Sequence, residues 1–236
     1  MRRLAKCRRS AFDQPIGPSL GDWRPPPFPA PIDLAGRTVR LEPLDPSVHA
    51  PPLFDAFIDA PDSLWTYLQY GPFADVEELR AALCTLCDSP EQLPFAAVVD
   101  GRPVGYLAYL RIVAVHGVIE IGSVAFAPEL QRTTAATEAV SLLITHAFDL
   151  GFRRVEWKCD DLNARSRVAA ERFGFRYEGT FRKAVVYKGR SRDTAWLAIT
   201  DDEWPAVAAA HRSWLAPENF DTAGRQRTRL TAPTKH

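Results

Sequence analysis

Residues 118–139 read VIEIGSVAFAPELQRTTAATEA, and this stretch decides the fold. Val118–Phe126 is an apolar run with the length of a strand, and Pro128 ends it. The short loop 127–132 then leads into a helix that the apolar spacing predicts over residues 134–150. The sequence therefore predicts a strand whose end lies beside a helix N-terminus.

The loop between this strand and this helix has the chemistry of an anion site. Free backbone N–H groups and the positive end of the helix dipole meet there, which suits a pyrophosphate, and Arg132 would add a positive charge. The alternative is an ordinary strand-to-helix connection in which Thr133 or Thr134 caps the helix. The loop alone does not decide between these interpretations.

Further strands and helices are expected on both sides of this stretch. The pattern predicts strands at 38–44, 95–99, 104–109 and 154–159, helices within 50–88, at 164–173 and around 204–214, and two strands joined by the turn 188–190. This mixed order indicates an α+β fold, with helices on the faces of one sheet, rather than a regular doubly wound fold.

Shifts in composition divide the chain into three parts. Residues 1–34 are rich in proline, which disfavours helices and favours an extended N-terminal arm. Residues 35–201 are expected to form the folded domain. Residues 202–236 are expected to form a C-terminal helix and a polar tail that is loose after Phe220.

Composition and charge exclude several classes of partner. The chain has 236 residues, 46% of them hydrophobic, which is enough for one full core. Lys+Arg and Asp+Glu are both 29, so no basic field attracts nucleic acid. No apolar run approaches the ~20 residues of a spanning helix, so we expect no membrane partner. Scattered cysteines and the lack of a secretory signal predict a cytoplasmic protein.

Neither the cysteines nor the histidines form a reactive or metal-binding pattern. Cys84 and Cys87 make a C-x-x-C, but no second pair or nearby histidine completes a tetrahedral site. The histidines are dispersed and lack a nucleophile motif. We therefore predict no metal and no hydrolase triad.

Two separate motifs resemble those of a known family. Residues 131–139, QRTTAATEA, resemble the pyrophosphate-binding motif of the GNAT acyltransferases, Gln/Arg-x-x-Gly-x-Gly/Ala, with the Thr-Glu-Ala that follows it in the ribosomal-protein alanine acetyltransferase (RimJ/RimL-like) branch. Downstream, Asn163–Ser166 and Phe173–Phe175 with Glu178 and Gly179 resemble the second signature of that branch. The resemblance covers about residues 36–200. It implies a GNAT-like mixed, mostly antiparallel, splayed sheet with helices on both faces.

The resemblance also implies how acetyl-CoA is held. The backbone of Val124, Ala125 and Phe126 would pair with the pantetheine as if it were an added strand. Asn163 and Ser166 would lie beside the pantetheine and the sulfur. The pyrophosphate would be held by Gln131, Arg132, Thr133, Thr134, Ala135, Ala136 and Thr137.

The chain departs from the motif at Thr134, which replaces the first glycine. Glycine is useful there because a Cβ crowds the approaching phosphate, so CoA binding is expected to be weaker or slightly displaced. If Thr134 has helical dihedral angles, its hydroxyl can instead donate to a phosphate oxygen. Ala136 keeps the small residue that the second position permits.

Glu120 is the first candidate for the general base that takes a proton from the acceptor amine. A charge between Ile119 and Ile121 needs a reason, and some GNAT enzymes carry a catalytic glutamate at the matching position. Strand alternation predicts that Glu120, Gly122, Val124 and Phe126 share one face. The alternative is a structural ion pair or a solvent-facing residue.

Glu156 is the reserve candidate for the base. Alternation places it on one face with Lys158 and Asp160, and three charged residues on one face indicate a solvated surface. Sequence does not decide between the two glutamates.

Ser166 is the candidate acid that protonates the departing thiolate, and it lies one helical turn after Asn163. The alternative is that Asn163 only caps the helix through Ser166. A thiolate leaves easily, so the acid can be dispensable.

The predicted reaction is acetyl transfer from acetyl-CoA to a primary amine of a small molecule or a peptide, through a ternary complex. The alternative is a GNAT-like module that binds CoA or a partner without catalysis. An acceptor pocket or a satellite hydrophobic cluster is expected from Trp65, Tyr67, Tyr70 and Phe73. A homodimer is left open.

Overall fold

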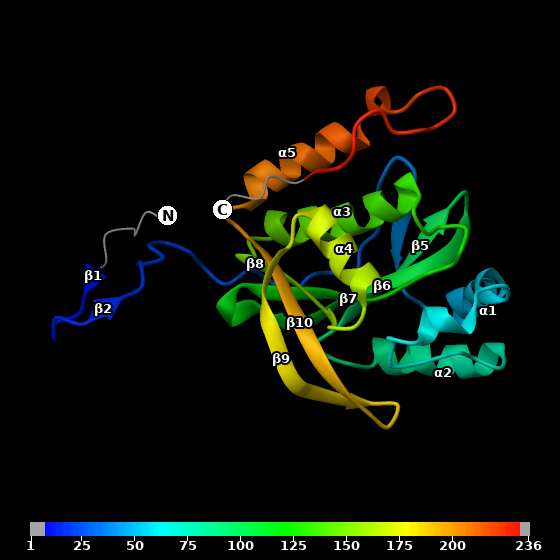
Figure 1. Ribbon diagram of the computed structural model, residues 1–236, viewed down its shortest axis with the longest axis horizontal. Helices are drawn as coiled ribbons and strands as arrows, with labels where there is room; N and C mark the ends of the chain where they lie inside the picture. Colours follow the sequence, from blue (N-terminus) through cyan, green and yellow to red (C-terminus); the bar gives the residue numbers. More distant parts are fainter. Residues whose placement is uncertain (1–7, 232–236) are drawn as a thin grey trace.

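Within residues 8–231, the main sheet has eight strands and is antiparallel except for one pair. A computed structural model describes residues 8–231. Its strand order is β3-β4-β5-β6-β7-β8-β10-β9, and β7 and β8 form the parallel pair (Figure 1). The strands are β3 (Leu34–Ala35), β4 (Arg40–Pro43), β5 (Leu93–Val99), β6 (Arg102–Val113), β7 (Val118–Phe126), β8 (Arg154–Asp160), β9 (Arg176–Tyr187) and β10 (Arg190–Thr200). The predicted mixed, mostly antiparallel α+β sheet is confirmed.

Helices cover the two faces of this sheet. On one face lie α1 and α2, and on the other α3, α4 and α5 (Figure 1). Their bounds are α1 (Pro46–Phe57), α2 (Val76–Cys87), α3 (Thr134–Asp149), α4 (Ala164–Phe173) and α5 (Trp204–Leu215), with short 3-10 turns η1 (Asp62–Trp65), η2 (Ala114–His116) and η3 (Pro217–Asn219).

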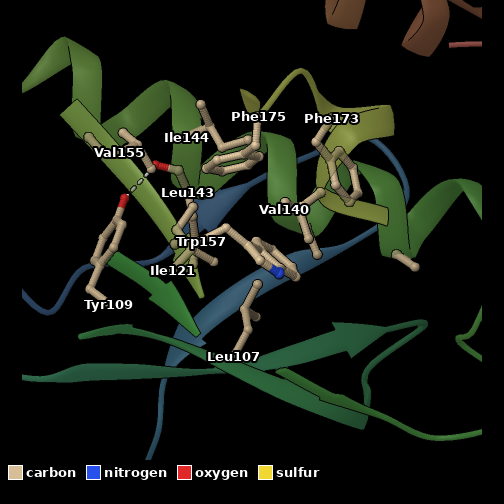
Figure 2. Close-up of a cluster of buried hydrophobic side chains, with 14 of the residues drawn as sticks. Leu107, Tyr109, Ile121, Val140, Leu143, Ile144, Val155, Trp157, Phe173 and Phe175 are labelled. Atoms are coloured by element: carbon tan, nitrogen blue, oxygen red, sulfur yellow. Dashed lines mark hydrogen bonds between the residues drawn. The ribbon is translucent and has the colours of Figure 1, made fainter. Parts of the chain in front are cut away.

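Each face has its own hydrophobic core. The larger core lies between the sheet and α3, and Figure 2 shows Val140, Leu143 and Ile144 of α3 gathered around Trp157. Tyr109 extends into the same core, where its hydroxyl donates to the Leu143 carbonyl at 2.6 Å. The smaller core lies under α1 and α2. Burial on both faces fixes the register of the central strands, because a slip of one residue would exchange the two faces.

The proline-rich arm predicted for residues 1–34 begins in residues 1–7, which lie outside the described residues. Within the described part, β1 (Arg8–Arg9) and β2 (Pro15–Ile16) form a small hairpin separate from the main sheet (Figure 1). The arm then reaches the body at Trp23, whose ring lies 5.7 Å from the Arg153 guanidinium carbon. β3 pairs with β4, so the expected start of the domain at residue 35 falls inside a strand.

The C-terminal segment differs from the loose tail that the sequence predicts after Phe220. The Asn219 side chain donates to the Trp214 carbonyl at 2.9 Å and accepts the Thr228 amide at 2.9 Å. Phe220 forms a bridge with Gln226, and Leu230 is buried. The segment therefore folds back onto α5 as far as residue 230. Composition missed this because buried Asn219, a polar residue, organises the turn.

Within residues 8–231, none of the helices is both long enough and apolar enough to cross a membrane.

Candidate active site

The parallel strands β7 and β8 separate in the middle of the sheet. They pair from Val118 with Arg154 to Ile121 with Trp157, and the pairing ends there although β7 continues to Phe126 and β8 to Asp160. Beyond this point each strand pairs only with its other neighbour, β7 with β6 and β8 with β10. We call the point of separation the fork. Beyond it, the β7 edge that faces β8 carries backbone groups that have no strand partner among residues 8–231.

A β-bulge at Ser123 turns the end of β7. Ser123 has a φ of 48°, and Ser123 and Val124 together lie opposite Leu107 in β6. The bulge interrupts the alternation of side chains, so Val124 and Phe126 pack against the larger core while Glu120 lies on the α1 and α2 face. The prediction that Glu120, Gly122, Val124 and Phe126 share one face is therefore wrong. Alternation holds only while the ladder has no extra residue.

The loop after β7 ends in the capped N-terminus of α3. Thr133 is the N-cap, and its hydroxyl accepts the Ala136 amide at 3.1 Å. Among residues 8–231, the amides of Thr134 and Ala135 have no hydrogen-bond acceptor. The Thr134 hydroxyl likewise makes no hydrogen bond within this range. Because these donors lie at the positive end of a helix of 16 residues, the site can hold an anion.

The other motif residues support this helix start. The Gln131 side chain donates to the Phe126 carbonyl at 2.8 Å, and Arg132 is exposed with a φ of 63°. Ala135 and Ala136 are buried against the larger core, where small side chains let the helix approach the sheet. The Thr137 hydroxyl accepts from Arg172 at 3.1 Å.

Glu120 is buried and ion-paired. Its Oε2 accepts from Nζ of Lys158 at 2.6 Å, and its side chain is only 9% exposed. Burial raises the pKa of the Glu120 carboxyl above its usual value, although Lys158 and Arg111 lower it. The other carboxylate oxygen, Oε1, has no donor among residues 8–231. It faces Gly122, where an added Cβ would lie 3.6 Å from it.

Glu156 belongs to the same buried group of charges. It contacts Nζ of Lys158 at 2.6 Å and Nε of Arg154 at 2.8 Å. Burial raises the pKa of Glu156, but the contacts with Lys158 and Arg154 outweigh burial and hold the pKa below its usual value. The prediction that Glu156, Lys158 and Asp160 form a solvated surface is wrong, because all three side chains are buried. This burial is tolerable because Glu156 pairs with Lys158 and Asp160 accepts from the Tyr187 hydroxyl at 2.9 Å, contacts that alternation cannot reveal.

Ser166 lies on the other face of the sheet, near the fork. Its hydroxyl accepts from the Trp157 indole at 2.9 Å, and its amide donates to the Asn163 side chain at 3.1 Å. Asn163 is thus the N-cap of α4, as the capping interpretation expects. The Trp157 ring packs between α3 and Phe173 in the larger core (Figure 2). Because Trp157 forms the last pair of the fork, it ties Ser166 to that point.

A pocket of about 630 Å³ lies beyond the fork, between the loop after η1 and the β9–β10 turn. Tyr67, Asp160 and Tyr187 contribute to its lining, and the Tyr187 hydroxyl donates to Asp160 at 2.9 Å. Trp65 is instead buried against Phe57 and Phe73, as expected of a satellite hydrophobic cluster. Of the four aromatic residues considered for an acceptor pocket, only Tyr67 therefore lines this one.

Sequence reasoning missed three side chains of this region. The sequence pattern indicates a solvated surface for Lys158 and a turn for Lys188, and it singles out nothing at Tyr187. The Lys188 ammonium donates to the Trp65 carbonyl at 2.8 Å and the Gly71 carbonyl at 2.7 Å, which closes one side of the pocket. The only signal for Lys158 was its position between two acidic residues on alternating strand positions.

A diverging parallel pair beside an uncapped pair of helix amides is the arrangement expected of an acyltransferase that takes its acyl group from CoA. Comparisons with known proteins agree with this class. The model of the Acetyltransferase (GNAT) family matches residues 55–175. A search of curated proteins found no significant match.

Solved structures extend the match to most of the chain. A GCN5-related N-acetyltransferase from Brucella melitensis is 46% identical, with a TM-score of 0.86 over 89% of this chain and 97% of that one. A probable GNAT-family acetyltransferase from Chromobacterium violaceum is 42% identical, with a TM-score of 0.78 over 82% and 98%. Mycobacterium smegmatis RimJ in complex with CoA-disulfide shares the fold, at 23% identity and a TM-score of 0.64 over 74% and 88%.

The chain belongs to the GNAT acetyltransferase family. It is an acetyl-CoA-dependent N-acetyltransferase, as the resemblance in residues 131–139 predicts.

Proposed function

We propose that the protein transfers the acetyl group of acetyl-CoA directly to a primary amine of a small molecule or a peptide, in a ternary complex at the fork. The observation that carries this proposal is the placement of Glu120 and Ser166 on opposite faces of the sheet, beside the point where β7 and β8 separate. A thioester held at the fork would have a base on one side and a hydroxyl donor on the other.

On the CoA side, the structure fits the cofactor in three respects. The unpaired edge of Val124–Phe126 offers backbone groups to the pantetheine amides. The free amides of Thr134 and Ala135 offer donors to the pyrophosphate. Thr134 has helical geometry, so its unpaired hydroxyl adds a third donor in place of the close approach that glycine allows. Arg132 and Gln131 supply charge and support at the loop.

On the amine side, Oε1 of Glu120 is the group that takes the proton. Oε2 is held by Lys158, whereas Oε1 has no donor among residues 8–231 and lies beside Gly122 at the fork. A carboxylate whose pKa is raised by burial is a stronger base than an exposed one. The pocket lined by Tyr67 and Asp160 gives the acceptor a place on this side of the structure.

The reaction follows from this arrangement. The ammonium group of the acceptor loses a proton to Oε1 of Glu120, and the freed lone pair attacks the thioester carbonyl. Backbone N–H groups of the β7 edge stabilise the oxyanion. After the attack the nitrogen of the tetrahedral intermediate carries two hydrogens and a positive charge, and it releases one proton to solvent. When the intermediate collapses, the C–S bond breaks and the electron pair leaves with sulfur, which takes a proton from the Ser166 hydroxyl. The hydroxyl regains a proton from solvent.

A covalent enzyme intermediate is not needed and is disfavoured at this site. Cys159 is the cysteine nearest the fork along β8, and it is buried in the larger core. Burial raises the pKa of its thiol, so the reactive thiolate is scarce at neutral pH. Direct attack by the amine therefore fits the site better than a two-step route through cysteine.

The test is to incubate the purified protein with acetyl-CoA and a panel of amines and to follow release of the free thiol. We expect release with at least one primary amine. Glu120→Gln should lower kcat/KM about 10²-fold or more at neutral pH, with a smaller deficit as the pH approaches the pKa of the amine, because the amine then loses its proton without help. The affinity for CoA should be unaffected.

Two outcomes would count against the proposal. Glu120→Gln with an unchanged pH profile would remove Glu120 as the base, and Glu156→Gln would then test the reserve candidate. Thermal stabilisation by CoA without thiol release for any amine would instead favour a CoA-binding module, for which the ion pair of Glu120 with Lys158 would be purely structural.

A further inference from the structure

Lys158 occupies a closed position among three groups that fix its ammonium. Nζ lies 2.6 Å from a carboxylate oxygen of Glu120 and 2.6 Å from one of Glu156, and its side chain is only 6% exposed. It also lies 3.9 Å from the centre of the Trp196 ring, which is directly opposite in the β8–β10 register. A lysine that only covered a surface would keep its ammonium in water.

The neighbours of Lys158 are themselves held. The Trp196 ring stacks on Phe181 at 4.5 Å, and the Arg111 guanidinium lies 5.2 Å from the same ring. Glu156 contacts Arg154, which donates to both carboxylate oxygens of Glu178 at 2.9 and 2.6 Å. Charges of alternating sign therefore run from Glu120 to Glu178 across the α1 and α2 face of the sheet, so Lys158 has little freedom to leave Glu120.

We propose that Lys158 is a positioning residue for acetyl transfer: it holds Oε2 of Glu120 and keeps this carboxylate ionised, so that Oε1 points toward the fork and accepts the proton of the amine. This inference rests on the proposed role of Glu120 as the base. It assigns to one buried lysine both the orientation and the charge state of that base.

The charged groups that face Glu120 come from two strands. Lys158 and Glu156 belong to β8, and Arg111 belongs to β6. Burial and the negative charge of Glu156 raise the pKa of Glu120, whereas Lys158 and Arg111 lower it. Removing Lys158 would leave the first two effects opposed only by Arg111. Removing the negative charge of Glu156 would instead lower the pKa of Glu120.

The inference can be tested because substitutions of Lys158 and Glu156 should shift the pKa of Glu120 in opposite directions. The pH dependence of kcat/KM is measured for the wild type and for Lys158→Met, Lys158→Arg and Glu156→Gln. The acid limb of this profile is the range in which kcat/KM falls as the pH decreases. We expect Lys158→Met to move the acid limb to higher pH by about one unit or more, which lowers kcat/KM about tenfold at a pH on that limb. Lys158→Arg should restore most of the wild-type profile. Glu156→Gln should move the limb to lower pH, because Lys158 then pairs with Glu120 alone.

Each outcome either supports or overturns the inference. A purely structural Lys158 would give Lys158→Met a loss of rate at every pH with the limb unmoved, and that result overturns it. Limbs that move in the same direction in Lys158→Met and Glu156→Gln also overturn it. If Lys158→Met does not fold, Lys158→Gln, which removes the charge but keeps a polar side chain, takes its place in the same measurement. A wrong assignment of Glu120 as the base would give a different result. In that case the pH profile of Glu120→Gln would keep the same acid limb as the wild type.

Discussion

Thr134 is the single residue at which this chain departs from the family motif, and its position allows its side chain to contact a phosphate. It is the first residue of α3, its amide is free, and its hydroxyl makes no hydrogen bond among residues 8–231. A glycine would leave more room for the phosphate but would offer one donor fewer. Threonine in place of glycine therefore adds a hydroxyl donor and takes up space beside the phosphate.

The hydroxyl leads to a prediction about CoA affinity. Thr134→Ala should raise the Kd for CoA about tenfold or more, because a hydrogen bond to a charged oxygen contributes about 1.5–3 kcal/mol. Thr134→Ser should bind like the wild type, since it keeps the hydroxyl. Isothermal titration with CoA measures both. Tighter binding by Thr134→Ala than by the wild type would show that the side chain obstructs the phosphate.

The sequence predicts helix caps better than it predicts the surroundings of the charged side chains. Thr133 and Asn163 cap helices where their residue types and positions predict caps. Glu120 was conspicuous because a charge between two isoleucines is unusual in a strand. Lys158 was not conspicuous, because a lysine between acidic residues looks the same on a solvated face and in a buried ion-pair chain. Whether such a lysine is solvated or buried depends on side chains that come from other strands.

At the scale of elements, β7 determines the geometry of the site. The apolar run Val118–Phe126 predicted its length, and the structure gives the same bounds. The bulge at Ser123 was not predictable, because an extra residue in the ladder depends on the register with β6 and not on local propensity. The fork also escapes local reasoning, since it depends on where β7 and β8 stop pairing.

α3 connects the site to the edge of the sheet through Glu138. This buried carboxylate accepts the amides of Arg37 at 2.8 Å and Thr38 at 2.6 Å, in the turn between β3 and β4. A Cβ on Gly36 would lie 2.7 Å from the Glu138 carboxyl carbon, so the turn has no room for a side chain there. The glutamate of the Thr-Glu-Ala sequence thus has a structural role in this chain, and it fixes the helix whose N-terminus carries the free amides.

At the scale of the whole molecule, α5 closes the larger core through a buried histidine. Nδ1 of His211 lies 3.0 Å from the Ser141 hydroxyl of α3, and Nε2 lies 2.9 Å from the Phe173 carbonyl at the end of α4. Burial lowers the pKa of His211 to about 4, because a charged imidazole is poorly solvated there. One side chain therefore joins three helices, and its burial favours the neutral form.

This histidine makes stability depend on pH. In the unfolded chain the imidazole binds a proton as the pH falls through about 6.5, whereas the folded protein binds it only near the lower pKa. The contribution of neutral His211 to the free energy of unfolding is therefore complete above about pH 6.5 and declines as the pH falls toward 4. We expect a loss of about 2 kcal/mol in the free energy of unfolding between pH 7 and pH 5.

Urea denaturation of the wild type and His211→Gln at the two pH values measures this effect. The variant should be less stable at pH 7 but should lose less stability on going to pH 5, because glutamine does not titrate. Equal losses in both proteins would show that other groups cause the acid sensitivity.

The central claim is that acetyl transfer takes place at the fork between β7 and β8. A crystal structure of the protein with bound CoA tests it most directly. We predict that the pyrophosphate lies on the amides of Thr134 and Ala135, that the pantetheine follows Val124–Phe126, and that the sulfur lies at the fork between Glu120 and Ser166. A pyrophosphate away from the N-terminus of α3, or a sulfur away from the fork, would contradict the account.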